Sequence, residues 1–327
     1  MKALVFEAPD KPVIADLAMP EISANEVLVR TRAVGICHSD YELLAGRYII
    51  PISYPVTPGH EWSGEIVEVG RNVTGFKAGD RVVGECVVRT PERLHHFGFS
   101  ISGADREFFA VNPEWLHKLP DAVDDKKAAL IEPFTCGFYA VLRSGGTNAS
   151  ETVVVSGGGT IGLVSAAAAI GMGARVIVVD PLATRRDVAL KLGADSAIDP
   201  SDGGAADRIR EMTGGHGADL VVEASGHDAS LAAAFDYARE DGRMSMVGIN
   251  IGRKVPVVIG QIQMKNLTVR GCIGSPGVWP AAIRFLERTG IDLSPIQTHD
   301  YALPDAVQAF AFGKDATKSI KITLLNG

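Results

Sequence analysis

Residues 152–272 repeat one pattern that restricts the fold more than any other feature of the sequence: a short apolar run followed by a run with helical periodicity. The apolar runs predict strands at Thr152–Ser156, Arg175–Asp180, Ala197–Ile198, Leu220–Glu223, Arg243–Gly248 and Leu267–Cys272. The runs between them predict helices at Ile161–Ile170, Ala183–Leu192, Asp207–Thr213 and Ser230–Arg239. Strands that are apolar along their whole length are typical of a parallel sheet with helices on both faces. The sequence therefore predicts a doubly wound α/β domain.

The two ends of the chain follow a different pattern. Short β-rich runs separated by Pro and Gly predict an all-β unit, a barrel or a sandwich, with strands at Lys2–Phe6, Glu26–Ala33, Gly64–Val69 and Arg81–Glu85. A helix is predicted over Asp124–Arg143. Toward the C-terminus the pattern predicts helices at Pro280–Thr289 and Ala302–Phe312 and a last strand at Ser319–Leu325.

Composition and charge exclude several classes of function. Of the 327 residues, 46% are hydrophobic and 22% are charged, which excludes a disordered chain. The formal net charge is −7, and no block of Lys and Arg occurs, so nucleic acid is not an expected partner. Four Cys in a chain of this length do not form a disulfide scaffold and favour a reducing, cytoplasmic location.

The sequence also argues against export and membrane insertion. The segment Met1–Glu7 reaches an acidic residue, Glu7, too early to be the start of a signal peptide. The longest apolar stretch, Thr152–Val179, is interrupted by glycines and by Arg175, whereas a membrane span needs about 20 predominantly apolar residues. We therefore expect no membrane partner.

A glycine motif lies between the first predicted strand of the middle region and its first helix. Gly157, Gly159 and Gly162 fit G-x-G-x-x-G, with Thr160 and Ile161 between the last two glycines. The pattern is weak alone, but a strand before it and a helix after it are the context of a dinucleotide site. The glycines allow a tight turn, close approach to a diphosphate and close helix packing. The helix N-terminus favours the diphosphate charge.

An acidic residue follows the second predicted strand. Asp180 comes 18 residues after Gly162, where a carboxylate would bind the ribose hydroxyls of NAD and repel the 2′-phosphate of NADP. Arg185, also a candidate cofactor contact, and Arg186 lie close by in the sequence and weaken this choice. The simpler alternative is a packing turn with a solvated Asp. We predict NAD as the cofactor.

Potential zinc ligands occur at three places outside that domain. Cys37, the pair His60 and Glu61, and Glu132 carry a thiol, an imidazole and carboxylates, all of which bind zinc in proteins. Each has an ordinary structural alternative when taken singly: a buried thiol, a hydrogen-bonded core histidine or a helix-capping acid. The combination of these residues is what carries a resemblance to a known family.

The segments around these donors resemble the zinc-dependent medium-chain dehydrogenase/reductase family. The similarity lies in residues 34–40 (VGICHSD), 58–64 (PGHEWSG) and 73–82 (VTGFKAGDRV), and with the glycine motif it spans nearly the whole chain. Residues 130–134 (LIEPF) resemble the polyol (sorbitol) and threonine dehydrogenase branch. Residues 1–9 and 54–64 also resemble the cyclitol (2-deoxy-scyllo-inosamine) dehydrogenases.

The resemblance implies an architecture of two domains. Residues 1–136 and 277–327 would form a GroES-like β-barrel catalytic domain, and residues 137–276 a Rossmann domain that binds NAD. The family is typically oligomeric, and we expect a homo-oligomer, either a dimer or a tetramer.

The resemblance also implies roles for individual residues. Cys37 and His60 would hold the catalytic zinc, with Glu61 as a third or alternating ligand. Neighbours in an extended segment point apart, so His60 and Glu61 need not both bind at once. Glu132 would be a ligand or would hold the metal-bound water. Ser39 would relay the substrate proton.

Two further neighbours receive supporting roles from the resemblance. Asp40 would orient His60. His38 occupies a position that contacts the cofactor phosphates in some relatives.

One segment departs from the family pattern. Most relatives carry four closely spaced Cys for a structural zinc, whereas residues 83–99 contain Cys86 alone. We therefore predict one catalytic zinc and no structural zinc. Cys86, His95 and His96 fit no ligand spacing and are interpreted as loop residues.

The predicted activity is hydride transfer between a secondary alcohol, such as a polyol, sugar alcohol or cyclitol, and NAD. A zinc ion would polarise the hydroxyl group. Two alternatives remain on the same fold: an NAD-binding sensing or regulatory protein, and a zinc-free quinone or enoyl reductase that uses NADPH.

Overall fold

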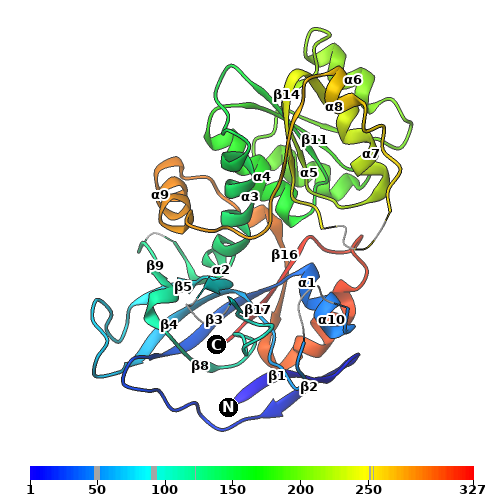
Figure 1. Cartoon of the computed structure of the whole chain (residues 1–327). Helices are drawn as coiled ribbons and strands as arrows, with labels where there is room; N and C mark the ends of the chain where they lie inside the picture. The colour runs from blue at the N-terminus through cyan, green and yellow to red at the C-terminus, as the bar shows by residue number, and fades with distance from the viewer. Residues whose placement is uncertain (48–51, 90–93, 122, 250–251, 253) are drawn as a thin grey trace. The chain divides into compact units, whose positions relative to one another are not determined.

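The structure is a computed structural model that describes residues 1–47, 52–89, 94–121, 123–249, 252 and 254–327. It divides into two compact units, one of Met1–Glu132 with Gln297–Gly327 and the other of Pro133–Ile296 (Figure 1). The sequence predicts changes of domain after residues 136 and 276, whereas the two units of the structure change after Glu132 and Ile296. We describe each unit by itself.

The Pro133–Ile296 unit contains a parallel sheet with the strand order β12-β11-β10-β13-β14-β15. Its strands are β10 (Thr152–Ser156), β11 (Arg175–Val179), β12 (Ser196–Ile198), β13 (Ala218–Glu223), β14 (Ala238–Met246) and β15 (Thr268–Gly271). Counted along the chain this order is 3-2-1-4-5-6, the order of a Rossmann sheet. The prediction of a doubly wound parallel sheet is confirmed. The order reverses at β10, which places the glycine motif at the switch point.

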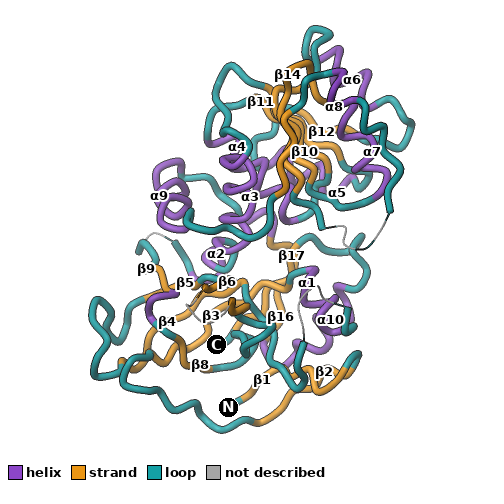
Figure 2. The backbone as a smooth tube through the Cα atoms, viewed as in Figure 1, coloured by secondary structure: helices purple, strands orange, loops and turns teal. Residues whose placement is uncertain are grey.

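Helices lie on both sides of this sheet, with α4 and α7 on opposite sides of the strands in Figure 2. The helices are α3 (Ile131–Arg143), α4 (Thr160–Gly171), α5 (Ala183–Lys191), α6 (Ala205–Met212), α7 (Asp228–Tyr237), α8 (Gln261–Met264) and α9 (Trp279–Thr289), with the 3-10 turn η2 (Ser294–Ile296). Four buried alanines, residues 166–169, let α4 lie close to the strands. A Cβ on Gly137 would lie 2.7 Å from the backbone nitrogen of Ser165, so α3 and α4 also pack closely.

Helix α9 belongs to this unit through aromatic packing. The ring of Phe285 lies 6.0 Å from that of Phe134 and 5.0 Å from that of Phe138, between ring centroids. A Cβ on Gly171 would lie 2.5 Å from the Phe285 ring. These contacts extend the unit beyond residue 276, the boundary predicted from the sequence. Helix periodicity shows that α9 has an apolar face, but it does not show which unit covers that face.

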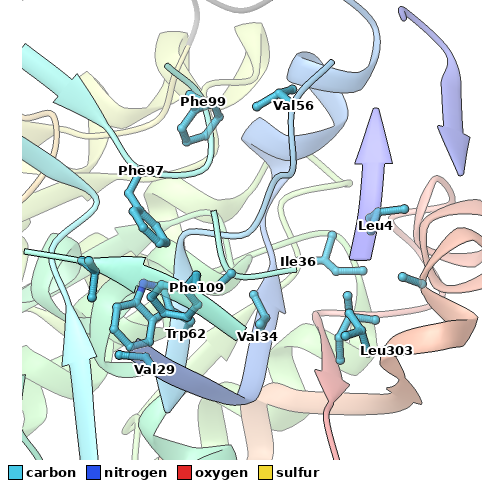
Figure 3. Packing of buried hydrophobic residues seen from close by; sticks show 14 of the residues in the cluster. Leu4, Val29, Val34, Ile36, Val56, Trp62, Phe97, Phe99, Phe109 and Leu303 are labelled. Carbon is cyan, nitrogen blue, oxygen red and sulfur yellow. The ribbon is translucent and has the colours of Figure 1, made fainter. Parts of the chain in front are cut away.

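The other unit is built on a sheet in the order β16-β17-β3-β4-β5-β9, with β8 paired to β3. Its strands are β3 (Val27–Ile36), β4 (Glu61–Val69), β5 (Arg81–Gly84), β8 (Phe108–Val111), β9 (Leu116–Lys118), β16 (Gln297–Ala302) and β17 (Lys321–Leu325). Buried aromatic side chains fill its core: the Trp62 ring lies 4.8 Å from that of Phe109 and 5.9 Å from that of Phe97 (Figure 3). The expected β domain built from both ends of the chain is confirmed.

Two hairpins and short helices complete this unit. The hairpins pair β1 (Lys2–Ala8) with β2 (Lys11–Asp16), and β6 (Val87–Arg89) with β7 (Leu94–His96). The helices are α1 (His38–Leu44), α2 (Asp125–Ala128) and α10 (Ala306–Gly313), with 3-10 turns η1 (Pro113–Trp115) and η3 (Leu303–Asp305). Within the described ranges of the chain, no helix has the length and apolarity to span a membrane.

The boundaries of several predicted helices differ in the structure. The helix predicted over 124–143 is two helices, α2 and α3, because the ring of Pro133 is incompatible with a helical carbonyl four residues earlier. The helix predicted over 302–312 begins only at Ala306, since β16 and η3 occupy the residues before it. Helix α7 ends at Tyr237, and the last two residues of its predicted range belong to β14.

Candidate metal and dinucleotide sites

The first donor, Cys37, follows strand β3 and is the N-cap residue of α1. Its backbone N–H donates a hydrogen bond of 2.8 Å to Oδ2 of Asp40, three residues further along. The Asp40 side chain is buried. This local capping fixes the direction in which the chain leaves the strand and brings a carboxylate next to the thiol.

The second donor, His60, precedes strand β4 and is buried. Gly59 before it has φ +93°, and a Cβ there would lie 2.6 Å from Oδ1 of Asp105, so only glycine fits. Nδ1 of His60 lies 3.3 Å from Oδ1 of Asp40, without the alignment of a hydrogen bond. The His60 ring also packs against Phe99, with 4.9 Å between ring centroids. Asp40 and His60 therefore lie next to each other, as expected from the sequence.

Charge and burial act in opposite directions on His60. Burial favours the neutral ring, but the facing Asp40 carboxylate outweighs it and raises the pKa of His60 well above its ordinary value. The ring therefore lies in a negative environment. Such an environment attracts a cation as well as a proton.

Glu61 begins strand β4 and completes a cluster of donors. Single ligand atoms of Cys37, His60 and Glu61 all lie within 4.8 Å of one another, and it is the one such group among the residues that the structure describes. Because His60 lies before the strand, the alternation of a strand does not apply to it and Glu61. The expectation that neighbouring side chains point apart is wrong here. A thiol, an imidazole and a carboxylate, mostly buried, are a donor set that fits zinc.

Glu132, the second residue of α3, is buried close to this cluster. Burial raises the pKa of Glu132 to about 7, and the charges of His60 and Glu61 act on it. Its carboxylate is not one of the three clustered ligand atoms. Of the remaining predicted residues, Ser39 is half-buried on α1, whereas the side chain of His38 is 87% exposed and lies 3.9 Å from Glu42.

The structure adds residues that sequence reasoning missed. Lys321 on β17 is buried, and its Nζ lies 2.6 Å from Oε2 of Glu61. Asp105 is buried beside Gly59, and burial, followed by the Asp40 charge, raises its pKa well above the ordinary value. The sequence offers a weak signal for Lys321 alone: a single lysine between isoleucines in a predicted strand.

In the segment after β5, the side chains of Cys86 and His95 have separate contacts. The thiol of Cys86 donates a weak hydrogen bond of 3.8 Å to the carbonyl of Phe97, and burial raises the pKa of Cys86. The ring of His95 packs against Trp115 instead, at 5.9 Å between centroids. Residues 90–93, part of the predicted loop, lie outside the described residues. The absence of a structural zinc remains a prediction.

The glycine motif lies at the end of β10, and each glycine has a different surrounding. A Cβ on Gly162 would lie 1.7 Å from the carbonyl oxygen of Gly157, which itself has φ +104°. A Cβ on Gly159 would have no atom within 4 Å among those described. Gly162 thus permits packing, whereas Gly159 keeps open space at the N-terminus of α4. Thr160 and Ile161 form the first turn of that helix.

Asp180 follows β11 and is held in place by the backbone. Its Oδ2 accepts a 2.7 Å hydrogen bond from the N–H of Gly158, and its Oδ1 accepts one of 2.8 Å from Leu182. Arg185 lies 3.5 Å from the same carboxylate. The carboxylate is therefore fixed beside the glycine turn, as a ribose-binding acid requires.

Comparison with known proteins agrees with this geometry. Residues 23–121 match the family "Alcohol dehydrogenase GroES-like domain", and residues 160–288 match "Zinc-binding dehydrogenase". The chain is similar to a sorbitol dehydrogenase of Halalkalibacterium halodurans, with 31% identity over 99% of both chains. It is also similar to an L-threonine 3-dehydrogenase of Streptomyces coelicolor, with 34% identity over 95% of both. The solved 2R,3R-butanediol dehydrogenase of Bacillus subtilis superposes with a TM-score of 0.91 at 28% identity, over 100% of this chain and 99% of that one.

Proposed function

We propose that this chain, which belongs to the zinc-binding dehydrogenases with an alcohol dehydrogenase GroES-like domain, oxidises a polyhydroxylated secondary alcohol with NAD. The observation that carries the proposal is the convergence of Cys37, His60 and Glu61 within 4.8 Å. The sorbitol and threonine dehydrogenases among its relatives act on secondary alcohols, and the residues 130–134 favour the polyol branch.

The chain's own residues divide the work of the reaction. When bound, zinc supplies a Lewis acid for the hydroxyl group and NAD supplies the hydride acceptor. Cys37, His60 and Glu61 would hold the zinc, and Asp40 faces the His60 ring and orients it. We assign to Ser39 the transfer of the hydroxyl proton away from the substrate. Glu132 supplies a further carboxylate, as a ligand or just outside the ligand set.

The preference for NAD rests on Asp180. Its carboxylate is fixed by the N–H groups of Gly158 and Leu182, so it cannot turn away from a 2′-phosphate without losing both hydrogen bonds. A negative charge held in that position favours the ribose hydroxyls of NAD. We further propose a cytoplasmic homo-oligomer, a dimer or a tetramer, with a catalytic zinc and no structural zinc.

The test is metal content by plasma emission, together with a screen of NAD and NADP reduction over polyols, inositols and threonine. We expect about one zinc per chain and turnover on one substrate class. Cys37→Ala should lose both zinc and turnover, whereas the matched control Cys272→Ala, outside the cluster, should keep both. Full activity of Cys37→Ala without zinc would refute the proposal. NAD binding with neither zinc nor turnover in the unmodified protein would favour a sensing protein.

A further inference from the structure

Arg106, two residues before strand β8, carries a charge that the fold does not pair. In the described part of the chain, no carboxylate forms an ion pair with its guanidinium, and Nε is closed off from water without a hydrogen-bond partner. Nη2 donates one long bond of 3.4 Å to the carbonyl of Ser102. Burial lowers the pKa of Arg106 to about 10, so the group is still a cation at neutral pH. A bound anion would supply the missing partner.

The guanidinium lies at the wall of a cavity of about 530 Å³, between the loop before β3, the segment after β7 and the end of β8. A cavity of this size holds an organic molecule rather than a single ion. Cζ of Arg106 lies 5.9 Å from the centroid of the Phe109 ring. This contact holds the cation in place but leaves its N–H groups available, because a ring face attracts the charge without accepting ordinary hydrogen bonds.

One part of the cavity wall is apolar. Phe97, Ile101 and Trp115 all line it. The Trp115 ring is supported from outside by His95, at 5.9 Å between ring centroids, and the Phe97 ring is supported by Phe109, at 5.4 Å. Aromatic side chains that are fixed in this way offer a ready surface for a flat apolar body.

Two asparagines add hydrogen-bond donors to the same wall. Oδ1 of Asn25 accepts a 2.9 Å bond from Asn72, and Oδ1 of Asn112 accepts one of 2.9 Å from the N–H of Glu114. Both asparagines line the cavity, and no described residue accepts a hydrogen bond from either of their NH₂ groups. The polar wall therefore offers donors to an acceptor-rich group.

A single carboxylate limits the charge that the cavity accepts. Glu26 lines the cavity too, and its Oε2 is held by a 3.0 Å hydrogen bond from the N–H of Ser23. A ligand with a second negative group would meet this fixed charge and be repelled. The ligand that fits best carries one negative charge at the end near Arg106.

We propose that this cavity is a binding site for a small organic monocarboxylate with a flat apolar body, whose carboxylate pairs with Arg106. Guanidinium and carboxylate groups match each other through parallel N–H···O bonds, and the apolar body would cover Phe97 and Trp115. None of the three clustered metal donors lines the cavity, so the site is separate from the one on which the proposed function depends.

The experiment is calorimetric titration of the whole protein with 2-naphthoate. We expect one site per chain, with at least tenfold weaker binding of the uncharged 2-naphthamide and of inorganic phosphate. Arg106→Met should weaken binding of 2-naphthoate at least tenfold. The matched control is Arg30→Met, because Arg30 also lies over a phenylalanine ring, 5.5 Å from the centroid of Phe108, but does not line the cavity. This control should bind 2-naphthoate like the unmodified protein.

Two further variants separate the site from misfolding and from the metal cluster. Ala110→Phe keeps Arg106 but fills part of the cavity, and it should also weaken binding. Cys37→Ala should bind 2-naphthoate unchanged, even though it loses zinc. In urea denaturation, 2-naphthoate should raise the midpoint of the unmodified protein but not that of Arg106→Met.

The outcomes that would overturn the proposal are distinct from those that test the dehydrogenase activity. No binding of 2-naphthoate, or equal binding by Arg106→Met, would overturn the site. Equal affinity for 2-naphthamide or phosphate would overturn the assignment of a monocarboxylate. Loss of binding in Cys37→Ala would place 2-naphthoate at the metal cluster instead. Zinc content and turnover, which decide the proposed function, do not enter any of these comparisons.

Discussion

Substitution by alanine at two glycines of the same motif should damage two different properties, stability at one and cofactor binding at the other. A methyl group on Gly162 would meet the carbonyl oxygen of Gly157 at 1.7 Å and its carbon at 2.9 Å, and neither backbone atom can move without shifting β10 or α4. A methyl group on Gly159 would meet no described atom within 4 Å, and its φ of −70° and ψ of −178° suit any residue. We predict that Gly162→Ala damages the fold, whereas Gly159→Ala damages cofactor binding alone.

The magnitudes follow from these distances. Overpacking costs about 1–3 kcal/mol, and a contact as short as that at Gly162 belongs at the upper end of this range. The smaller entropy of the unfolded chain returns about 0.4–1 kcal/mol, so Gly162→Ala should lower the free energy of unfolding by about 2 kcal/mol. At Gly159 the same gain offsets the loss of a glycine N-cap, which leaves a change within about 0.5 kcal/mol.

Urea denaturation and NADH fluorescence titration separate the two effects. Gly159→Ala should keep its denaturation midpoint, while its Kd for NADH rises at least about tenfold, equivalent to about 1.4 kcal/mol, because the methyl group occupies the space of the diphosphate. Gly162→Ala should show a lower midpoint. Unchanged NADH affinity in Gly159→Ala would refute the assignment of this space to the cofactor. Unchanged stability in Gly162→Ala would refute the steric argument.

Three more substitutions test the electrostatics of the β unit. Asp40→Asn removes the charge that faces His60, and the zinc affinity should fall about 10- to 100-fold. The affinity is measured by competition with a chromophoric chelator, and an unchanged value would contradict the role of Asp40 in orienting His60. Burial raises the pKa of Glu132 from 4.5 to about 7, so between these pH values the folded protein keeps Glu132 protonated while the unfolded chain releases the proton. With EDTA present to remove metal, the free energy of unfolding should therefore fall by about 3 kcal/mol as the pH rises from 4.5 to 7. In urea denaturation, Glu132→Gln should reduce the difference in the free energy of unfolding between pH 5 and pH 7.5. An unchanged difference would contradict the assignment of this pH dependence to Glu132. Burial lowers the pKa of Arg106 to about 10, so Arg106→Met should raise the free energy of unfolding by about 1–3 kcal/mol, and a lower denaturation midpoint would count against this reasoning.

The parallel sheet could be predicted from sequence because its determinants are local. Strand β10 begins and ends where its apolar run does, and α4 differs from its predicted range by one residue at each end. A buried parallel strand must be apolar on both faces, and a glycine turn must follow it, so each element carries its own signal. The break between α2 and α3 had such a signal too, in Pro133, but the periodicity on either side of the proline outweighed it.

The donors of the metal cluster could be named from the sequence, but their geometry could not. Cys37 and Asp40 are linked by a local cap, which the C-x-x-D spacing allows. His60 lies just before β4 and outside the regular strand, so the alternation rule does not apply to it and Glu61. The glycine before it is crowded by Asp105, from a segment more than 40 residues away, and that contact has no local pattern in the sequence.

Lys321 shows why a buried charge escapes a reading of the sequence. A lysine between two isoleucines in a strand is interpreted as the exposed side of an alternating pattern, because an unpaired buried ammonium is costly. In the structure residues 321–324 are all buried, and the face that carries Lys321 meets Glu61, which lies 260 residues earlier in the chain. Gly35 makes the meeting possible, and it belongs to a third strand. A charge that is buried through three separate segments is visible only after the sheet is assembled, because no one segment carries the signal for its partner.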